Sequence, residues 1–153
     1  MGLYKPSELR QFLESLGVSP KKGLSQNFLI DGNILKKMVE AAQLKKGETV
    51  LEIGPGPGAL TEALLGEGVR VIAIEKDEVL ARHLERLDSR DSLRVIQEDI
   101  RHVDLAKLLE REGKVKVVAN IPYSITGLLL QTLLPLGKHI QSLHLMVQKE
   151  VAD

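Results

Sequence analysis

The chain has 153 residues, of which 43% are hydrophobic and 27% charged, a composition typical of one globular domain with a hydrophobic core. It contains no cysteine, which excludes a disulfide framework and a thiolate metal site, and we expect no metal of any kind. No apolar run approaches the roughly 20 residues that a bilayer-spanning helix needs, so we expect a cytoplasmic protein without membrane contact.

The net charge is zero, but the charges are unevenly distributed along the chain. Residues 1–47 carry eight Lys/Arg against four Asp/Glu, whereas residues 48–113 carry nine against fifteen. A polyanion would therefore be met by the N-terminal segment rather than by the central block. An ordinary solvated surface explains the same pattern equally well.

Apolar periodicity predicts two helices, over 7–16 and 31–43, followed by strands that alternate with helices. The predicted strands are short continuous apolar runs, which is typical of a parallel sheet covered on both faces. We therefore expect a doubly wound α/β fold, with an N-terminal helical segment (1–47) and a Rossmann-like core (48–153) in one structural domain. The strands are expected at 49–53, 69–74, 93–96, 115–119 and 143–147, and the later helices at 60–65, 77–87, 104–111 and from about 124 to 136.

A loop rich in glycine and proline, 54–59 (GPGPGA), follows the first predicted strand and opens a helix. With Glu75 at the end of the next strand it also satisfies the dinucleotide pattern, so NAD is one alternative. However, Pro55 and Pro57 lack the N–H groups that a pyrophosphate needs. Glu52 adds a negative charge, which suits a cofactor that carries an ammonium and a sulfonium. These features favour S-adenosylmethionine.

Acidic residues also follow the later strands, where ligands bind in such sheets. Glu75 is placed to accept hydrogen bonds from both hydroxyls of a ribose. Asp99 is suited to an adenine amine, but Glu98 beside it is another candidate, and spacing alone does not choose between them.

The residues Asn120, Ile121, Pro122 and Tyr123 are expected just past the fourth strand, and they indicate methylation of an aryl amine. The Asn120 carbonyl and a backbone carbonyl next to Pro122 would accept both amine hydrogens, which localises the nitrogen lone pair. Tyr123 offers a flat face for a flipped base, a stacking contact worth roughly 1–3 kcal/mol. The rest of the chemistry is positioning for in-line displacement at the methyl group.

Four stretches resemble the ribosomal RNA adenine dimethyltransferases, most closely the small-subunit enzymes: 21–31 (KKGLSQNFLID), 51–56 (LEIGPG), 120–123 (NIPY) and 146–152 (MVQKEVA). The resemblance implies a class I methyltransferase fold. It also implies dimethylation of two adjacent adenosines near the 3′ end of small-subunit rRNA, within a pre-30S-type particle during ribosome biogenesis. The cofactor pocket would be formed by Asn27, Leu29, Gly54, Gly56, Glu75, Asp99 and Asn120.

Basic residues of the N-terminal segment, Lys21 and Lys22, are our candidates for contacts to RNA phosphates. We expect the protein to be a monomer.

The chain departs from the family pattern in two places. Gly127 and Leu128 stand where the family has a Ser/Thr-rich stretch and a proline. The chain also stops at Asp153, whereas the family continues with two further strands and a small helical domain. We therefore expect an N-terminal fragment whose fifth strand is an unprotected edge.

Three alternatives remain open from the residues. One is the large-subunit rRNA enzyme that confers macrolide resistance and shares the same motifs. The second is a non-catalytic assembly factor of the same fold, and the third is an NAD-dependent oxidoreductase.

Overall fold

A computed structural model describes residues 32–88 and 91–148. Helix α3 (Gly32–Ala41) is followed by strands that alternate with helices. The strands are β1 (Thr49–Ile53), β2 (Arg70–Glu75), β3 (Leu93–Gln97), β4 (Val115–Pro122) and β5 (Ile140–Gln148). The α-helices between them are α4 (Ala59–Gly66), α5 (Glu78–Leu84), α6 (Leu105–Leu109) and α7 (Thr126–Leu133). Short 3₁₀ helices are η1 (Glu85–Leu87), η2 (Ile100–His102), η3 (Tyr123–Ile125) and η4 (Leu134–Leu136).

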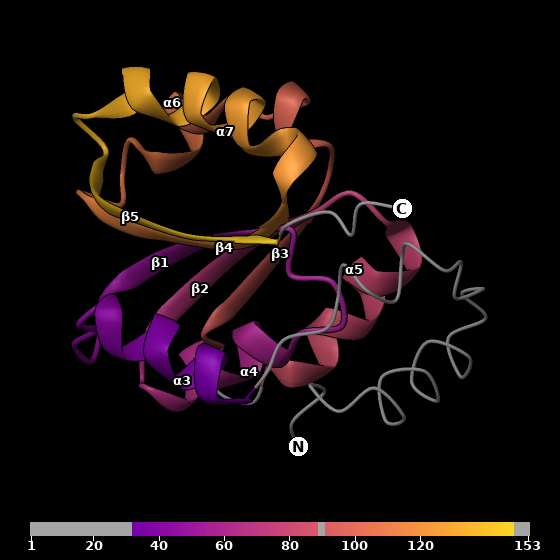
Figure 1. The fold of residues 1–153 in the computed structure, drawn as a ribbon. Helices are drawn as coiled ribbons and strands as arrows, with labels where there is room; N and C mark the ends of the chain where they lie inside the picture. The colour runs from indigo at the N-terminus through magenta and orange to yellow at the C-terminus, as the bar shows by residue number, and fades with distance from the viewer. Residues whose placement is uncertain (1–31, 89–90, 149–153) are drawn as a thin grey trace.

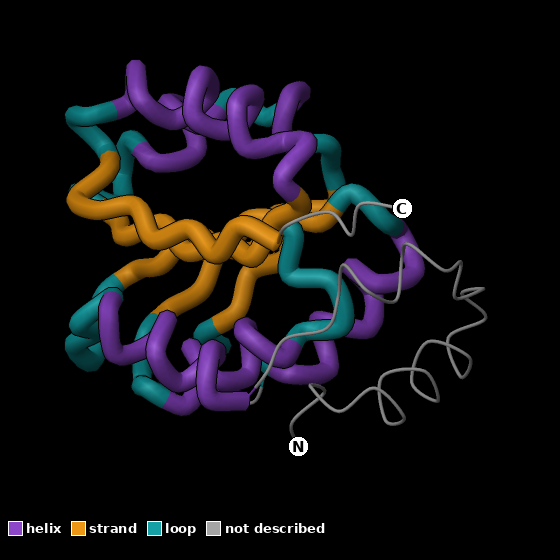
Figure 2. The backbone as a smooth tube through the Cα atoms, viewed as in Figure 1, coloured by secondary structure: helices purple, strands orange, loops and turns teal. Residues whose placement is uncertain are grey.

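All five strands are parallel and lie in the order β3-β2-β1-β4-β5, which confirms the predicted doubly wound sheet. Helices α3, α4 and α5 cover one face, and α6 and α7 cover the other (Figure 1; the same layers appear in Figure 2). The strand order reverses between β1 and β4. In open sheets of this kind the crevice at that switch point is where ligands bind.

Each face of the sheet carries its own hydrophobic cluster, because successive side chains of a strand point to opposite faces. Val50 packs with α3 and α4, whereas Leu51 and Ile53 pack with α6 and α7. All three side chains are buried. Burial on both sides explains why the strands read as continuous apolar runs in the sequence.

Several element boundaries differ from the predicted ones, and the largest differences concern β4 and β5. Strand β5 begins at Ile140 and pairs with β4 as far as Pro122, opposite Gln148. Asn120, Ile121 and Pro122 therefore belong to β4 itself, and the expectation that they follow the strand is wrong. Pro122 is tolerated because it is the last residue of the strand, where the missing N–H removes little pairing.

Four α-helices are shorter than predicted, since α5 and α7 continue as the 3₁₀ helices η1 and η4. Helix α3 ends at Ala41, shortly before Gln43 adopts a left-handed φ of 49°, and α6 covers only Leu105–Leu109. In the described residues β5 pairs with β4 alone and forms one edge of the sheet. None of the described helices is long and apolar enough to cross a membrane.

Candidate active site

A cavity of about 350 Å³ opens at the carboxyl ends of β1, β2 and β3. It brings together Gly54, Glu75, Glu98 and Asp99, four residues that the sequence places at three different strand ends. The other lining residues are Ile53, Ile74, Lys76, Ile100, Arg101, Ile125, Leu128 and Leu129. The cavity therefore has an acidic side and an apolar side, which suits a nucleoside with a polar ribose and a flat base.

The N–H groups of the glycine loop donate to other groups of the protein, on β2 and within the loop. Gly54 donates to Ile74 O at 3.0 Å, and Gly58 donates to Pro55 O at 3.1 Å. Gly56 donates to Glu75 Oε1 at 2.8 Å. Since the two prolines have no N–H, residues 54–58 offer no free donor to a phosphate. This geometry supports the argument against a pyrophosphate-containing cofactor.

Glu75 is held in place by backbone donors on both of its carboxylate oxygens. Oε1 accepts from Gly56, and Oε2 accepts from Asp77 N at 2.8 Å. Burial raises the pKa of Glu75, and these two N–H groups offset part of that effect. A carboxylate has about four lone-pair positions, so roughly two stay available for the hydroxyls of a ribose.

Glu52 is a fully buried carboxyl on β1, next to the glycine loop. Thr61 of α4 donates its hydroxyl to Oε1, while Oε2 accepts no hydrogen bond from the described residues. Burial raises the pKa of Glu52 to about 8, so it is mostly protonated at neutral pH. The expectation that Glu52 contributes a negative charge at neutral pH is therefore wrong, because desolvation outweighs its one hydrogen bond.

Asn120 lies beside Glu52 on the same face of the sheet. Glu52 pairs with Val118, and Asn120 is two residues further along β4, so both side chains point to the side of α3 and α4. Asn120 Oδ1 is buried and, like Glu52 Oε2, has no hydrogen-bond donor among the described residues. A buried acceptor without a donor is costly, and a ligand group with N–H bonds would satisfy Asn120 Oδ1.

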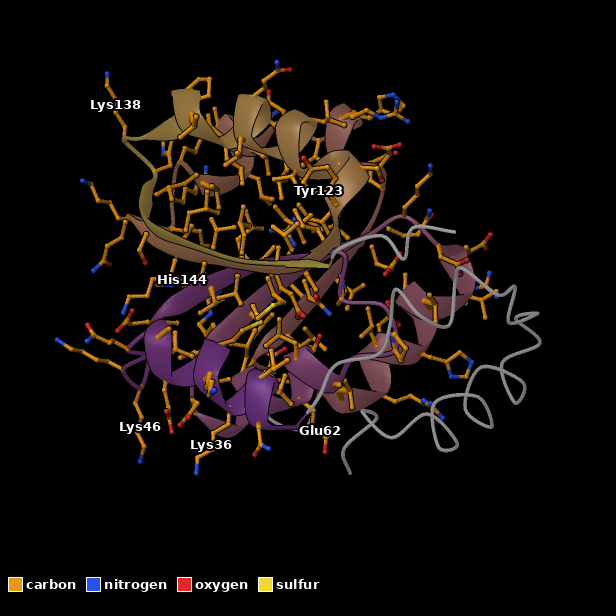
Figure 3. The ribbon with its side chains drawn as sticks, in the orientation of Figure 1. Lys36, Lys46, Glu62, Tyr123, Lys138 and His144 are labelled. Atoms are coloured by element: carbon orange, nitrogen blue, oxygen red, sulfur yellow. The ribbon has the colours of Figure 1, made fainter. Side chains whose placement is uncertain are left out.

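Among the described residues, no strand pairs with the backbone of residues 120–122 on the side of β1. Strand β1 pairs with β4 only as far as Ala119, because the chain then leaves β1 at Gly54. Tyr123 begins η3 directly afterwards, and its side chain is 66% exposed. It lies at the start of α7, where β4 ends (Figure 3). An exposed ring directly after a strand end that β1 does not cover is an arrangement that can receive a flipped base.

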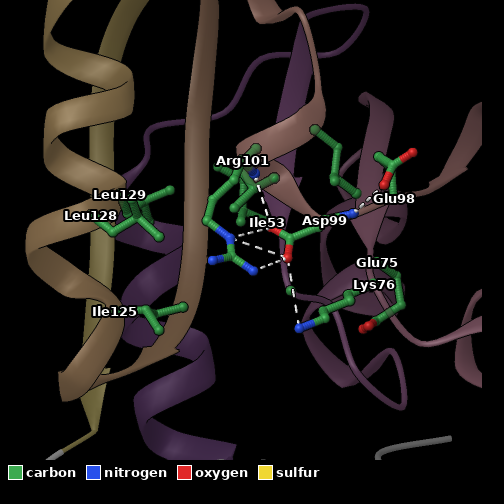
Figure 4. Close-up of a pocket in the computed structure, with 12 residues that line it drawn as sticks. Ile53, Glu75, Lys76, Glu98, Asp99, Arg101, Ile125, Leu128 and Leu129 are labelled. Atoms are coloured by element: carbon green, nitrogen blue, oxygen red, sulfur yellow. Dashed lines mark hydrogen bonds and ion pairs between the residues drawn. The ribbon is translucent and has the colours of Figure 1, made fainter.

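Asp99 is tied to two cations that the sequence did not single out. Arg101 Nη2 donates to Asp99 Oδ2 at 2.7 Å, and Lys76 Nζ lies 3.6 Å from the same oxygen. The hydrogen bonds from Arg101 hold the pKa of Asp99 well below its usual value. Arg101 and Lys76 approach the carboxylate of Asp99 from two sides (Figure 4). An arginine two residues after an aspartate resembles any solvated charge, so the sequence carries no signal for this pair.

The apolar side of the pocket was likewise missed. Ile125, Leu128 and Leu129 lie across the pocket from Glu75 and Lys76 (Figure 4). They come from η3 and the first turn of α7 and therefore look like ordinary core residues in the sequence. The departure from the family pattern at Leu128 is the one signal that pointed here.

Some predicted residues are not in this pocket. Gly56, Asn120, Ile121 and Tyr123 do not line it. Asn120 and Ile121 belong to β4, and Tyr123 begins η3, two residues before the lining residue Ile125. Lys21, Lys22, Asn27 and Leu29, the candidates of the N-terminal segment, lie outside the described residues.

Comparison with known proteins gives consistent relatives. The chain is 50% identical over 157 residues to the ribosomal RNA small subunit methyltransferase A of Protochlamydia amoebophila, covering 99% of this chain and 55% of that protein. It is 46% identical over 155 residues to the protein of the same name from Deinococcus radiodurans, covering 99% and 50%. The chain thus spans about half the length of the curated relatives that it matches.

Solved structures show the same architecture. The 23S rRNA methyltransferase ErmE has a TM-score of 0.62 at 29% identity, covering 72% of this chain and 44% of that one. A dimethyladenosine transferase from Plasmodium falciparum has a TM-score of 0.56 at 31% identity, covering 69% and 37%. An S-adenosylmethionine-dependent methyltransferase from Thiobacillus denitrificans, solved with S-adenosyl-L-homocysteine, shares the fold with a TM-score of 0.55 at 19% identity, covering 73% and 45%.

The fold is therefore that of the class I S-adenosylmethionine-dependent methyltransferases. The family described as ribosomal RNA adenine dimethylase matches residues 17–153, which is most of the sequence. The chain belongs to the ribosomal RNA adenine dimethylase family.

Proposed function

We propose that this chain carries the cofactor pocket and the amine-binding residues of an S-adenosylmethionine-dependent enzyme that dimethylates adenine amines in small-subunit rRNA. The observation that carries the proposal is the buried Oδ1 of Asn120 near the end of β4, which has no donor in the part of the chain that the structure describes. Asn120 is in the strand that leads directly to Tyr123, whose ring is exposed, and a nucleoside-sized cavity opens at the neighbouring strand ends. The relatives at 46% and 50% identity bear small-subunit names, which favours that substrate.

S-adenosylmethionine would supply an electrophilic methyl group, and the chain's own residues would position both partners. Glu75 is preset by Gly56 and Asp77 to accept a ribose diol. The apolar side of the cavity would hold the adenine ring of the cofactor. Asn120 Oδ1 needs a donor, and an amino-acid ammonium group would provide one. An ammonium next to Glu52 would also favour the carboxylate form of that side chain.

Asn120 and the open backbone of residues 120–122 would act on the substrate. An amide oxygen and a backbone carbonyl can accept both hydrogens of an adenine amine, which turns its lone pair toward the methyl donor. Tyr123 would stack on the flipped base. Lys21 and Lys22 would contact RNA phosphates from the N-terminal segment.

A second candidate substrate is large-subunit rRNA, because ErmE is named as a 23S rRNA methyltransferase. The two candidates share the chemistry at Asn120 and differ in the RNA that is presented. Unmethylated small and large ribosomal subunits, offered in parallel with labelled cofactor, would separate them.

The proposal is tested by the variant Asn120→Ala. We expect methyl transfer to unmethylated small subunits to fall by about 100-fold or more, the usual effect of removing a transition-state hydrogen-bond partner. Binding of S-adenosylhomocysteine, measured by calorimetry, should fall much less. The matched control is Gln141→Ala, another amide residue on the sheet, which is exposed on β5 and outside the pocket. Near-wild-type turnover of Asn120→Ala would contradict the role proposed for this residue.

A further inference from the structure

Arg101 extends from η2 into the pocket and surrounds the carboxylate of Asp99. Its Nη2 donates to Oδ2 at 2.7 Å, and its Nε lies 3.1 Å from Oδ1 and 3.2 Å from Oδ2. Its backbone N donates to Oδ1 at 2.9 Å. Lys76 Nζ approaches Oδ2 at 3.6 Å from the other side (Figure 4).

These contacts surround the carboxylate of Asp99 with cationic donors. A carboxylate has about four lone-pair positions. Three N–H groups of Arg101 take three of them: the backbone N on Oδ1, Nη2 on Oδ2, and Nε, which is shared between the two oxygens. The remaining position faces the ammonium of Lys76, so the amine of an incoming adenine would meet a cation at every acceptor position of Asp99.

The pair is nevertheless built so that the guanidinium can leave. The Arg101 side chain is 54% exposed, so the guanidinium can move into water without burying a charge. When it moves, the backbone N of Arg101 still orients Oδ1, and Lys76 still balances the charge beside Oδ2. Asp99 then keeps its place with one oxygen free to accept a donor.

We propose that Arg101 is a positioning residue that occupies the carboxylate of Asp99 in the nucleoside pocket. An adenine amine can donate to Asp99 only when the guanidinium of Arg101 is displaced. This inference rests on the function proposed above, because it takes an adenine nucleoside as the ligand. It also gives Asp99, rather than Glu98, the contact to the amine. The affinity for the cofactor therefore includes the free energy of breaking the Arg101–Asp99 pair.

The test is the variant Arg101→Ala with two ligands, S-adenosylhomocysteine and S-inosylhomocysteine, whose base has a carbonyl in place of the amine. We expect the Kd for S-adenosylhomocysteine to fall by about two- to fivefold, the range for releasing an exposed ion pair. The Kd for S-inosylhomocysteine should stay unchanged, since this ligand offers no amine to Asp99. In an Asp99→Ala background, Arg101→Ala should change neither Kd.

The matched control is Arg82→Ala on α5. Arg82 also pairs with a carboxylate at 2.7 Å, that of Glu78, but it lies outside the pocket. Its removal should leave both ligand affinities unchanged.

The possible results separate cleanly. Weaker binding of S-adenosylhomocysteine by Arg101→Ala would show that Arg101 contacts the ligand, which overturns the inference. An unchanged affinity, or an equal gain for both ligands, overturns it as well. If neither the wild-type chain nor Arg82→Ala binds S-adenosylhomocysteine, the proposed function itself is contradicted, and the inference with it.

Discussion

Glu52 lies beneath the glycine loop as a buried acid, and its exchange for glutamine is expected to stabilise the protein at neutral pH. The side chain is 1% exposed and has one hydrogen bond, from Thr61. Burial raises the pKa of Glu52 from 4.5 to about 8. Glutamine keeps the shape and a carbonyl acceptor for Thr61 but has no proton to lose.

The magnitude follows from proton linkage. The stabilising effect of the raised pKa is fully present below about pH 4.5 and is lost as the pH rises toward about 8, because only the unfolded chain releases the proton in that interval. Between these two pKa values, each pH unit lowers the free energy of unfolding by about 1.4 kcal/mol. At neutral pH the loss is therefore about 3 kcal/mol, an upper limit for the gain in the free energy of unfolding from Glu52→Gln.

Urea denaturation of wild type and variant at several pH values between about 5 and 8 measures this gain. The difference between the two proteins should grow steadily with pH. The control is Glu67→Gln at the end of α4, where the side chain is exposed and little change is expected. A difference that is the same at both ends of the pH range would refute the reasoning, since it would mean that Glu52 titrates as an ordinary acid.

Two further substitutions test the loop and the apolar side of the pocket. Gly58→Ala should lower the free energy of unfolding by about 1–3 kcal/mol, because Gly58 has a φ of 101° and an added Cβ would lie 2.8 Å from Leu87 Cδ1. The control is Gly66→Ala at the other end of α4, where an added Cβ meets open space. Urea denaturation should show Gly66→Ala to be neutral or stabilising, and equal losses of the two variants would contradict the argument. Leu128→Ala should raise the Kd for S-adenosylhomocysteine by about three- to tenfold through lost apolar contact. Leu134→Ala, 70% exposed and outside the pocket, should not change that Kd, and an equal effect of both would argue against a contact at Leu128.

Local patterns predicted most of the fold correctly. Strand β1 was predicted with its observed boundaries, because a short apolar run ended by glycine and proline has few other conformations. The predicted end of β4 was wrong, because a proline such as Pro122 usually indicates the end of a strand. Pairing with β5 keeps the chain extended to that residue, and such pairing involves a partner more than twenty residues away.

Four lining residues of the candidate site, Gly54, Glu75, Glu98 and Asp99, also followed from the sequence. In a parallel α/β sheet the residues after the strands meet at one edge, so their position in the sequence implies their proximity. The apolar residues of α7 did not follow. Leu128 and Leu129 reach the pocket only because α7 packs on the face of the sheet that holds Leu51 and Ile53.

The sequence by itself determined the class of fold and the strand ends that line the candidate pocket, because these depend on residue order and on motifs. Only the tertiary structure decided the charge of Glu52, since desolvation depends on what surrounds a side chain. The same holds for the availability of Asp99: its acceptor oxygens are occupied because Arg101 and Lys76 converge on it in space. Protonation and hydrogen-bond capacity are properties of the environment, and the folded chain creates that environment.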